Sequence, residues 1–530
     1  MTSDLSQAAS VVEIAEAVVT TAGKALASLP GGVDANQVLA YDVAHAAAAV
    51  HTAHALLEYG AKGEVEAKLT NAFVADAVAE LASRLHGREE LWGVDADALA
   101  GANDFLKTYR DPSFLADLAD AGPGPRHLDD DFTSVQDTFR EFTNDRIQPN
   151  AERIHRENAD IPEELISELA DLGAFGLSIP EEYGGFSDGG ESEYIAMVIA
   201  TEEFSRGSLG AGGSLITRPE ILARALMKGG TEEQKAEWLP KLSSAEVMNA
   251  VAVTEPDYGS DVANIKVTAT RDGDDWVING VKTWCTMAAR ADVLMLLART
   301  DPDRSKAHRG LSLFIVPKER GDGHGFDFEQ DGANGNGGGK MSGRAIDTIG
   351  YRGMHSYEVS FENWRVGSDG LVGGEDGLGQ GFYYQMAGFE NGRLQTAARA
   401  VGLMQAAYEA AVQYAGERHV FGQAIGEYQL TKAKLARMAF IIQAARQGSY
   451  AVARQMAKGE GSLEAAMVKA YVCKAAEWVT REAMQIHGGF GYAEEYPVSR
   501  YFVDARVLSI FEGADETLCL KVIARRLAEK

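Results

Sequence analysis

The spacing of hydrophobic positions indicates that the chain begins with a helical region. Residues 1–125 are rich in alanine and have the pattern of helices. In one stretch, apolar residues recur at close to the spacing of one helix face: Val43, Ala47, Val50 and Leu57. We therefore expect a helical N-terminal extension over residues 1–125.

The rest of the chain predicts two helical domains separated by a strand-rich one. After the linker-like sequence A-G-P-G-P-R, residues 130–250 return to helices, and one of them begins at Pro162 and ends at Gly173. Within residues 251–375, strands are predicted by V-L-M-L-L-A-R-T, L-S-L-F-I-V-P and Y-E-V-S-F-E-N-W-R-V. Residues 378–530 hold long amphipathic stretches with short loops, typical of a helical bundle. The pattern predicts an α+β protein with several domains.

Composition narrows the range of partners and compartments. The 530 residues carry a net charge of -28, which argues against nucleic acid or an anionic membrane as the main partner. The cysteines Cys285, Cys473 and Cys519 are odd in number and widely spaced, as expected in a reducing cytosol. The sequence contains no signal-peptide pattern and no apolar run long enough for a bilayer. We expect a cytoplasmic protein without a membrane partner.

The stretch from Val253 to Thr286 offers hydroxyl groups and an aromatic surface. Thr254 and Ser260 stand in a Pro/Gly-rich loop, where they can face a polar ligand. Trp284 and Thr286 are two residues apart, so in an extended strand they share one face, which suits a flat heteroaromatic ring. A β-meander with a core tryptophan is the alternative reading of this stretch alone.

Four further motifs connect the chain with a known family. They are P-E-E-Y-G-G at 180–185, E-R-H-V-F-G-Q-A-I-G-E-Y-Q at 417–429, Q-I-H-G-G-F-G at 485–491 and I-F-E-G-A-D-E at 510–516. By these motifs the chain from about residue 130 resembles the acyl-CoA dehydrogenase family. The resemblance implies a helical N-terminal domain, a central β-barrel or sheet domain and a C-terminal four-helix bundle. It also implies FAD as cofactor and oxidation of an acyl-CoA thioester at its α and β carbons.

The same resemblance implies a catalytic base. In relatives, a glutamate that precedes a glycine on a turn between two C-terminal helices removes the α-proton, and F-E-G places Glu512 there. Such a base has to be partly desolvated. Some relatives carry the base on the first bundle helix, where this chain has Gly392, which cannot act.

Cofactor contacts are implied from two sides. Thr254, Trp284 and Thr286 would hold the flavin ring of FAD. Residues of the bundle would meet the FAD of a neighbouring subunit: Arg418, Phe421, Gln429, Gln485 and Gly489. The active unit would then be a homodimer or a homotetramer, with electron-transferring flavoprotein as the electron acceptor. The chain has E-G-A-D-E where many relatives have E-G-T-S-Q, so the last three of these residues are not expected to bind FAD.

The substrate contacts are implied less directly. Ser260 and Arg393 would lie along the CoA arm, and Arg218 could meet a charged acyl tail, although a surface position for Arg218 is equally open. The helical extension and the sequence T-I-G-Y-R-G-M-H-S-Y-E resemble the branch that converts methylsuccinyl-CoA to mesaconyl-CoA. Tyr351 and His355 in that sequence are further candidates for substrate contact.

Other functions remain open at this stage. The chain could be a short-chain or branched-chain acyl-CoA dehydrogenase with an uncharged acyl group, a relative without catalysis, or an oxidase. The glycine-rich segment from Gly325 to Glu358 is expected to be a surface excursion rather than a phosphate-binding loop. His51, His54 and Glu58 have a metal-like spacing on one helix but lack further ligands, so we expect solvated side chains and predict no metal.

Overall fold

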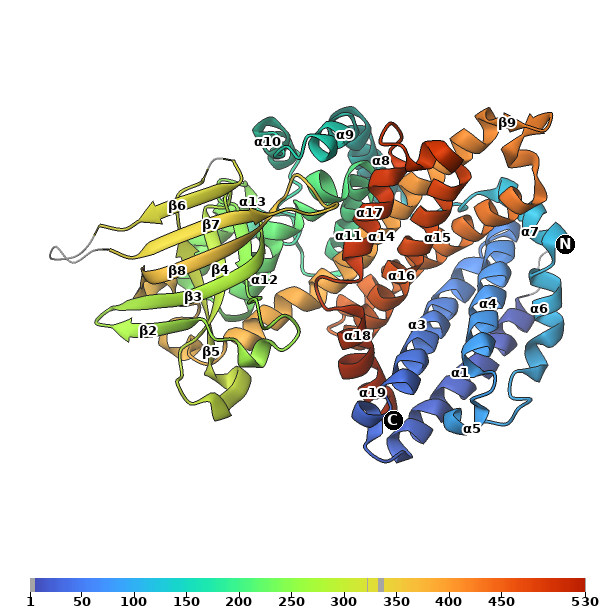
Figure 1. Cartoon of the computed structure of the whole chain (residues 1–530), viewed down its shortest axis with the longest axis horizontal. Helices are drawn as coiled ribbons and strands as arrows, with labels where there is room; N and C mark the ends of the chain where they lie inside the picture. Colours follow the sequence, from blue (N-terminus) through green and yellow to red (C-terminus); the bar gives the residue numbers. More distant parts are fainter. Residues whose placement is uncertain (1–4, 322, 332–337, 530) are drawn as a thin grey trace. The chain divides into compact units, whose positions relative to one another are not determined.

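The computed structural model describes residues 5–321, 323–331 and 338–529 and divides the chain into two compact units (Figure 1). The first unit combines the chain up to Arg140, residues 205–207 and everything from Arg393 onward. The second holds residues 141–204 and 208–392. The helices α8 (Asp130–Phe142), α11 (Glu191–Gly207) and α14 (Gly381–Glu417) pass from one unit to the other.

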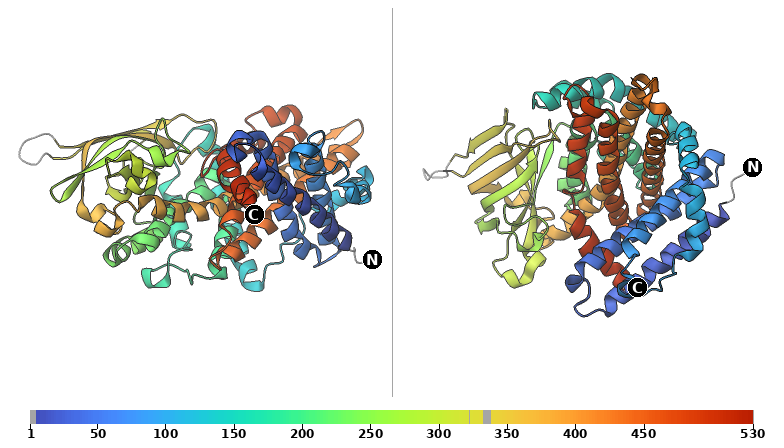
Figure 2. Two further views of the ribbon diagram at one scale, coloured as in Figure 1. Left: turned by 90° about the horizontal axis from the view of Figure 1, so that it is seen from below. Right: turned by 45° about the vertical axis from the view of Figure 1, so that its right-hand side comes forward.

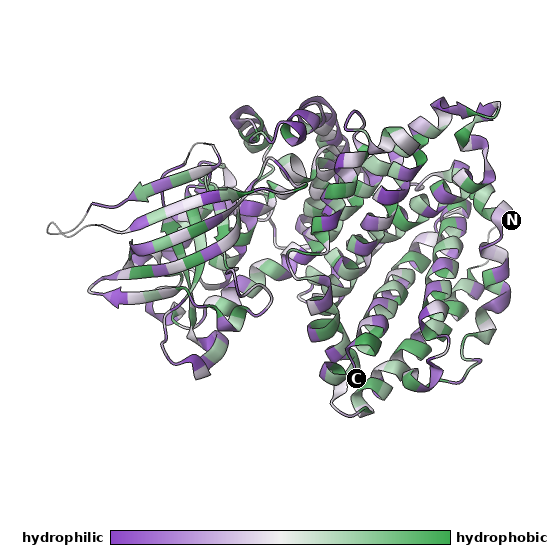
Figure 3. Ribbon diagram, in the orientation of Figure 1, coloured by the Kyte–Doolittle hydropathy of each residue, from purple (hydrophilic) through white to green (hydrophobic). Residues whose placement is uncertain are grey.

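The first unit is helical throughout, apart from one short hairpin. Its N-terminal helices are α1 (Ser6–Ser28), α2 (Gly32–Ala35), α3 (Gln37–Gly60), α4 (Glu64–Leu85), α5 (Glu89–Trp92), α6 (Asn103–Tyr109) and α7 (Pro112–Leu118). Hydrophobic positions run along α3 and α4 (Figure 3). The small alanine side chains let these helices approach their neighbours closely. The predicted helical extension is confirmed.

The C-terminal helices of this unit form the surface that the extension covers. They are α14, α15 (Gln429–Met456), α16 (Ser462–Ile486), α17 (Val498–Leu508), α18 (Asp515–Thr517) and α19 (Ala524–Ala528). Helix α3 packs against α15 and α16, and α4 packs against α15 (Figures 1 and 2). The Gly/Pro linker between extension and bundle also lies on α15, because Gln443 Nε2 donates to the Pro125 carbonyl at 2.9 Å. Strands β9 (His419–Val420) and β10 (Gln423–Ala424) form the hairpin between α14 and α15.

The second unit combines helices with one sheet. The helices are α9 (Gln148–Arg156), α10 (Glu163–Asp171), α11, α12 (Thr217–Gly229) and α13 (Glu232–Ser243). The strands are β1 (Asn249–Ala252), β2 (Thr268–Asp272), β3 (Asp275–Thr286), β4 (Val293–Arg299), β5 (Leu311–Pro317), β6 (Gly325–Glu329), β7 (Lys340–Ile346) and β8 (Ser356–Gly367). Helix α13 begins with a capping box, in which Thr231 and Gln234 satisfy each other's backbone N–H groups.

The sheet has the strand order β1-β4-β2-β3-β8-β7-β6, and β5 pairs with β4. Strand β4 is parallel to β1 and β2, whereas the other pairs are antiparallel. Every residue of β4 is buried, because Leu294 and Leu296 face one core while Met295 and Leu297 face a second core shared with α12 and α13. A strand covered on both faces reads as a continuous apolar run, which explains V-L-M-L-L-A-R. The predicted order of helical, β and helical domains behind an extra helical region is confirmed.

Candidate active site

The Thr254 loop is held against β3 by a buried ion pair. Lys282 Nζ lies 2.9 Å from Glu255 Oε1 and donates to the Val253 carbonyl at 2.8 Å. The Thr283 N–H donates to the Thr254 carbonyl at 2.8 Å. Burial lowers the pKa of Lys282 to about 8, although Glu255 acts in the opposite direction. These contacts bring the predicted flavin residue Thr254 beside the end of β3.

The end of β3 differs from the predicted regular strand. Its register against β8 shifts between Lys282 and Cys285, and Trp284 has a φ of 58°. The prediction that Trp284 and Thr286 lie on the same face of an extended strand is therefore wrong. Trp284 is 55% exposed, whereas Thr286 is buried and shares a 3.0 Å hydrogen bond with the Ser356 hydroxyl. An exposed indole next to a hydroxyl group still fits a flat aromatic ligand.

We expect Lys282→Met to lower the free energy of unfolding by about 3–5 kcal/mol, because Glu255 then stays buried without its cation. The same change should lower the FAD content of the purified protein, since the Thr254 loop loses its anchor. Urea unfolding and the flavin-to-protein absorbance ratio measure the two effects. Lys266→Met, at an exposed lysine beside Asp257, is the matched control and should change neither. Wild-type stability in the Lys282 variant would contradict the role of the pair.

Glu512 lies on the turn after α17, in the first unit. It has a φ of 51°, in the left-handed region that non-glycine residues rarely adopt, and Gly513 follows with a φ of 95°. Its side chain is 9% exposed. Lys469 Nζ supports the turn by donating to the carbonyls of Phe511 at 2.8 Å and Gly513 at 2.6 Å. The turn therefore presents a largely desolvated carboxylate in a fixed backbone setting.

Two residues of α14 hold the Glu512 carboxylate. Thr396 Oγ1 donates to Oε2 at 2.7 Å, and Arg399 Nη2 donates to the same oxygen at 2.6 Å. Arg399 also lies over the Phe511 ring, 4.9 Å from its centroid. Both atoms of this cradle come from a helix, so the carboxylate is positioned by a rigid element.

Sequence reasoning missed these supporting residues: Lys282, Glu255, Thr396, Arg399 and Lys469. A signal for two of them was present, because Thr396 and Arg399 are polar residues in a mostly apolar part of a helical segment. A buried polar side chain requires a partner, but its identity depends on a turn more than 100 residues away.

The predicted cofactor residues of the bundle lie at two neighbouring chain segments. Tyr414 of α14 stacks on His487 at the end of α16, with ring centroids 4.3 Å apart, which joins the two segments. All five residues, Arg418, Phe421, Gln429, Gln485 and Gly489, are exposed. Phe421 is 99% exposed with a φ of 52°. An aromatic side chain and a guanidinium offered to solvent fit the adenine and the pyrophosphate of FAD.

The predicted substrate residues fall in different surroundings. Arg218 is 5% exposed, so the surface position considered from sequence is excluded. Tyr351 and His355 are also buried, and both have positive φ values, 58° and 44°. Ser260 is exposed and Arg393 is half-buried. Arg218, Tyr351 and His355 are therefore buried positions, whereas Ser260 and Arg393 reach solvent.

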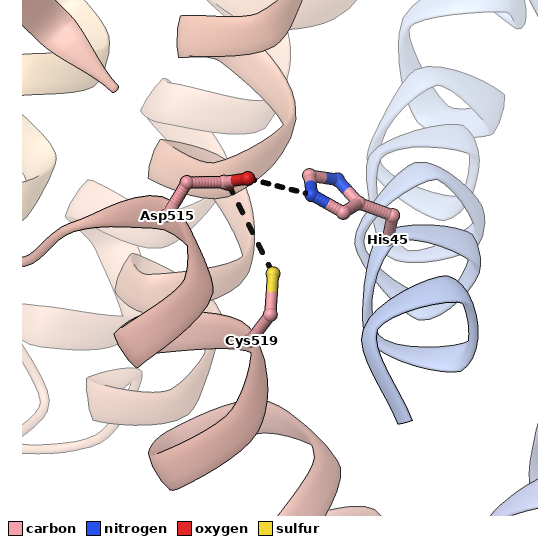
Figure 4. A group of neighbouring side chains, drawn as sticks. All are labelled: His45, Asp515 and Cys519. Atoms are coloured by element: carbon pink, nitrogen blue, oxygen red, sulfur yellow. Dashed lines mark hydrogen bonds and ion pairs between the residues drawn. The ribbon is translucent and has the colours of Figure 1, made fainter. Parts of the chain in front are cut away.

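Asp515, three residues after Glu512, is bound by the N-terminal extension. Its Oδ2 lies 3.1 Å from His45 Nε2 of α3 (Figure 4). The same oxygen accepts a hydrogen bond from the hydroxyl of Tyr41, also on α3, at 2.5 Å. Lys474 Nζ lies 3.8 Å from the same oxygen. Burial raises the pKa of Asp515, but the hydrogen bonds from His45 and Tyr41 outweigh it and leave the pKa below its ordinary value of 3.8. The extension therefore contacts the segment that carries the predicted base.

We expect Asp515→Asn to weaken attachment of the extension by about 1–3 kcal/mol, because the amide lacks the charge that Lys474 faces and cannot satisfy both donors on α3 equally. Below pH 3.8 the unfolded chain binds more protons than the folded one. The stability that Asp515 adds to the attached extension is therefore present above pH 3.8. It is lost as the pH falls through the lower pKa that Asp515 has in the folded protein. Limited proteolysis of the extension against pH measures it. Asp104→Asn, which removes an exposed pair with Lys107 inside the extension, is the control and should leave the cleavage rate unchanged.

Further predictions concern the glycine-rich segment, the histidines of α3 and membrane-spanning helices. Strands β6 and β7 occupy residues 325–329 and 340–346, so the predicted surface excursion is wrong for these parts of the glycine-rich segment, and residues 332–337 lie outside the described residues. His54 Nε2 lies 3.1 Å from Glu16 on α1, an ordinary surface pair. In the part of the chain that the structure describes, no helix is long and apolar enough to cross a membrane.

Known proteins agree with this architecture. Sequence models of the acyl-CoA dehydrogenase N-terminal, middle and C-terminal domains match residues 129–246, 250–364 and 379–528. The (2S)-methylsuccinyl-CoA dehydrogenase of Cereibacter sphaeroides is 45% identical over 407 residues, which cover 77% of this chain and 71% of that protein.

Solved structures show the same fold. A glutaryl-CoA dehydrogenase in complex with glutaryl-CoA has a TM-score of 0.67 and 33% identity, over 75% of this chain and 95% of that one. A glutaryl-CoA dehydrogenase from Mycobacterium smegmatis in complex with FADH2 has a TM-score of 0.65 and 26% identity, over 76% and 96%.

The chain belongs to the acyl-CoA dehydrogenase family. It is an FAD-dependent oxidoreductase that dehydrogenates acyl-CoA thioesters, and electron-transferring flavoprotein is the electron acceptor typical of such enzymes. The helices before residue 129 lie outside all three family matches.

Proposed function

We propose that the substrate is (2S)-methylsuccinyl-CoA and the product mesaconyl-CoA. The observation that carries this proposal is the 45% identity with a dehydrogenase of that specificity, over 77% of the chain. The second carboxylate of this substrate needs a cation within an otherwise apolar pocket. Arg218, a buried guanidinium on α12, supplies a positive charge of the required kind.

The reaction removes one proton and one hydride from neighbouring carbons. Glu512 takes the proton from the α carbon, and its largely desolvated position favours proton abstraction at a weakly acidic carbon. Thr396 and Arg399 keep the carboxylate in one orientation during this step. The Glu512 backbone N–H donates to the thioester carbonyl and stabilises the negative charge that develops there.

Bound FAD supplies the acceptor for the β-hydride and its electron pair. Thr254, Trp284 and Thr286 hold the flavin ring, and Ser260 and Arg393 follow the CoA arm. Tyr351 is assigned a weaker role at the acyl end, whereas the His355 ring, also predicted as a substrate contact, lies against Asp160. With proton and hydride removed, a carbon–carbon double bond remains.

Two copies of the chain complete each cofactor site in this proposal. The residues offered to a partner's FAD are accompanied by exposed apolar side chains, among them Phe421, Leu430, Phe490 and Tyr492. A patch of this kind on a single chain is typical of an interface. We infer a homodimer or a homotetramer, and light scattering with and without FAD distinguishes these from a monomer.

The test is anaerobic bleaching of the flavin by three thioesters. Methylsuccinyl-CoA should bleach the purified protein, whereas butyryl-CoA and isobutyryl-CoA should do so poorly. Arg218→Met should remove the preference for the charged substrate, while Arg309→Met, at an exposed arginine, should keep it. Bleaching by the uncharged thioesters alone would overturn the substrate and leave the enzyme a short-chain or branched-chain acyl-CoA dehydrogenase.

A further inference from the structure

Three metal-ligand side chains meet in the second unit at the ends of three separate segments. Asp160 lies between α9 and α10, His324 directly precedes β6, and His355 directly precedes β8. One ligand atom from each lies within 4.8 Å of the other two. The residues are far apart in the sequence, so the cluster is a product of the fold.

Two of these ligand atoms are buried and form a close ion pair that does not meet hydrogen-bond geometry. His355 Nε2 and Asp160 Oδ1 lie 3.1 Å apart. Within the described part of the chain, neither atom has a hydrogen-bond partner of acceptable geometry, and His355 is only 6% exposed. Buried polar atoms are rarely left in this state, so the pair calls for a bound group. A proton on His355 gives an ion pair with Asp160 but no well-aligned hydrogen bond, whereas a metal ion can bind both atoms at once.

The donor set selects the class of ion. Two imidazole nitrogens and one carboxylate oxygen are typical zinc ligands, at about 2.0–2.2 Å from the metal. Tetrahedral ligands at that distance lie about 3.3 Å apart, close to the 3.1 Å between His355 and Asp160. His324 is exposed, so its ring can turn toward the ion and water can occupy the fourth position.

The two arginines near this cluster bind acceptors outside it. The Arg290 guanidinium pairs with Glu163 and also donates to the Ile161 carbonyl. Arg352 donates to the carbonyls of Thr348 at 3.1 Å and His155 at 2.9 Å. Both positive charges are thus oriented by their own acceptors, and among the described residues Asp160 Oδ1 accepts no hydrogen bond from either guanidinium.

A second group of ligand residue types provides a contrast. His45, Asp515 and Cys519 also lie together (Figure 4), but Asp515 Oδ2 already accepts from Tyr41 and faces His45 and Lys474. The ammonium group of Lys474 occupies the place of a cation there. In the Asp160 cluster, His355 Nε2 and Asp160 Oδ1 have no hydrogen-bond partner among the described residues. In the Asp515 cluster, Oδ2 of Asp515 already accepts a hydrogen bond.

We propose that Asp160, His324 and His355 form a structural zinc site. The ion connects the α9–α10 loop and the start of β6 to the residue before β8. His355 is also joined to the end of β3, because the Met287 N–H donates to its carbonyl at 2.8 Å. The site therefore supports the turn that follows Trp284 and Thr286.

Zinc titration of the untagged full-length protein, stripped with a chelator, tests the site. Competition against a chromophoric chelator should show one tightly bound zinc per chain. His324→Ala should weaken binding by more than about 100-fold, since loss of a mere second-shell partner already costs about 10–100-fold. His86→Ala removes an exposed histidine of the first unit and should leave the affinity unchanged. Because His355 variants are at risk of misfolding, Asp160→Asn provides the second ligand test, with Co²⁺ absorption as a direct report of imidazole ligation.

The proposal is overturned if the wild-type chain binds no zinc, or if His324→Ala and Asp160→Asn both retain full affinity. Loss of binding in His45→Phe but not in His324→Ala would assign the ion to the Asp515 cluster and overturn it as well. None of these outcomes depends on the FAD content or the turnover rate of the enzyme.

Discussion

Glu512→Gln is expected to lower the rate of flavin bleaching by substrate by about 10²–10⁴-fold, the contribution of a positioned general base. The amide has the size of the carboxylate and can still accept from Thr396 and Arg399, but it cannot take the α-proton. FAD content should therefore stay at the wild-type value. Stopped-flow absorbance under anaerobic conditions measures the rate, and the flavin-to-protein ratio measures the content.

Glu516→Gln is the matched control, because Glu516 lies on α18, four residues after Glu512, and is exposed. It should bleach at the wild-type rate. A wild-type rate in the Glu512 variant would mean that another group removes the proton. The first bundle helix cannot supply it at the position used by some relatives, since Gly392 stands there.

The fold was predictable because its periodicities are local. Leu294 to Leu297 read as a buried strand, and the alanine-rich stretch around Val43 reads as a helix, without knowledge of their neighbours. The same holds for the Gly/Pro linker. The site residues were predicted from short motifs, which fix residue type and spacing within one stretch of the chain.

The supporting contacts were not predictable from pattern alone. Tyr41 meets Asp515 across 474 positions, and Thr396 meets Glu512 across 116. No local signal identifies such partners. The irregular backbone at Trp284 could not be predicted from sequence either. Its register shift arises in the pairing of β3 with β8, which lies far along the chain.

Arg399→Met is expected to lower kcat by about 100-fold while the KM for the CoA thioester stays near the wild-type value. Arg399 Nη2 lies 2.6 Å from Glu512 Oε2, so its loss frees the carboxylate to move. A displacement of about 1 Å at a reacting group costs about 10²-fold in rate. Steady-state kinetics with methylsuccinyl-CoA and a dye acceptor separate kcat from KM. Arg481→Met, at an exposed arginine of α16, is the control and should leave both unchanged.

A merely structural arginine would give a different result. Arg399 is fully buried, so its removal leaves an unpaired carboxylate and should also destabilise the fold by about 3–5 kcal/mol. Lower stability alone reduces the amount of active enzyme and leaves the pH profile unchanged. Loss of the guanidinium disfavours the charged form of Glu512, so the acid limb of the kcat profile should move to higher pH. Arg399→Lys keeps the positive charge and should return that limb toward the wild-type position. An unshifted limb in Arg399→Met would leave Arg399 with a role in packing only.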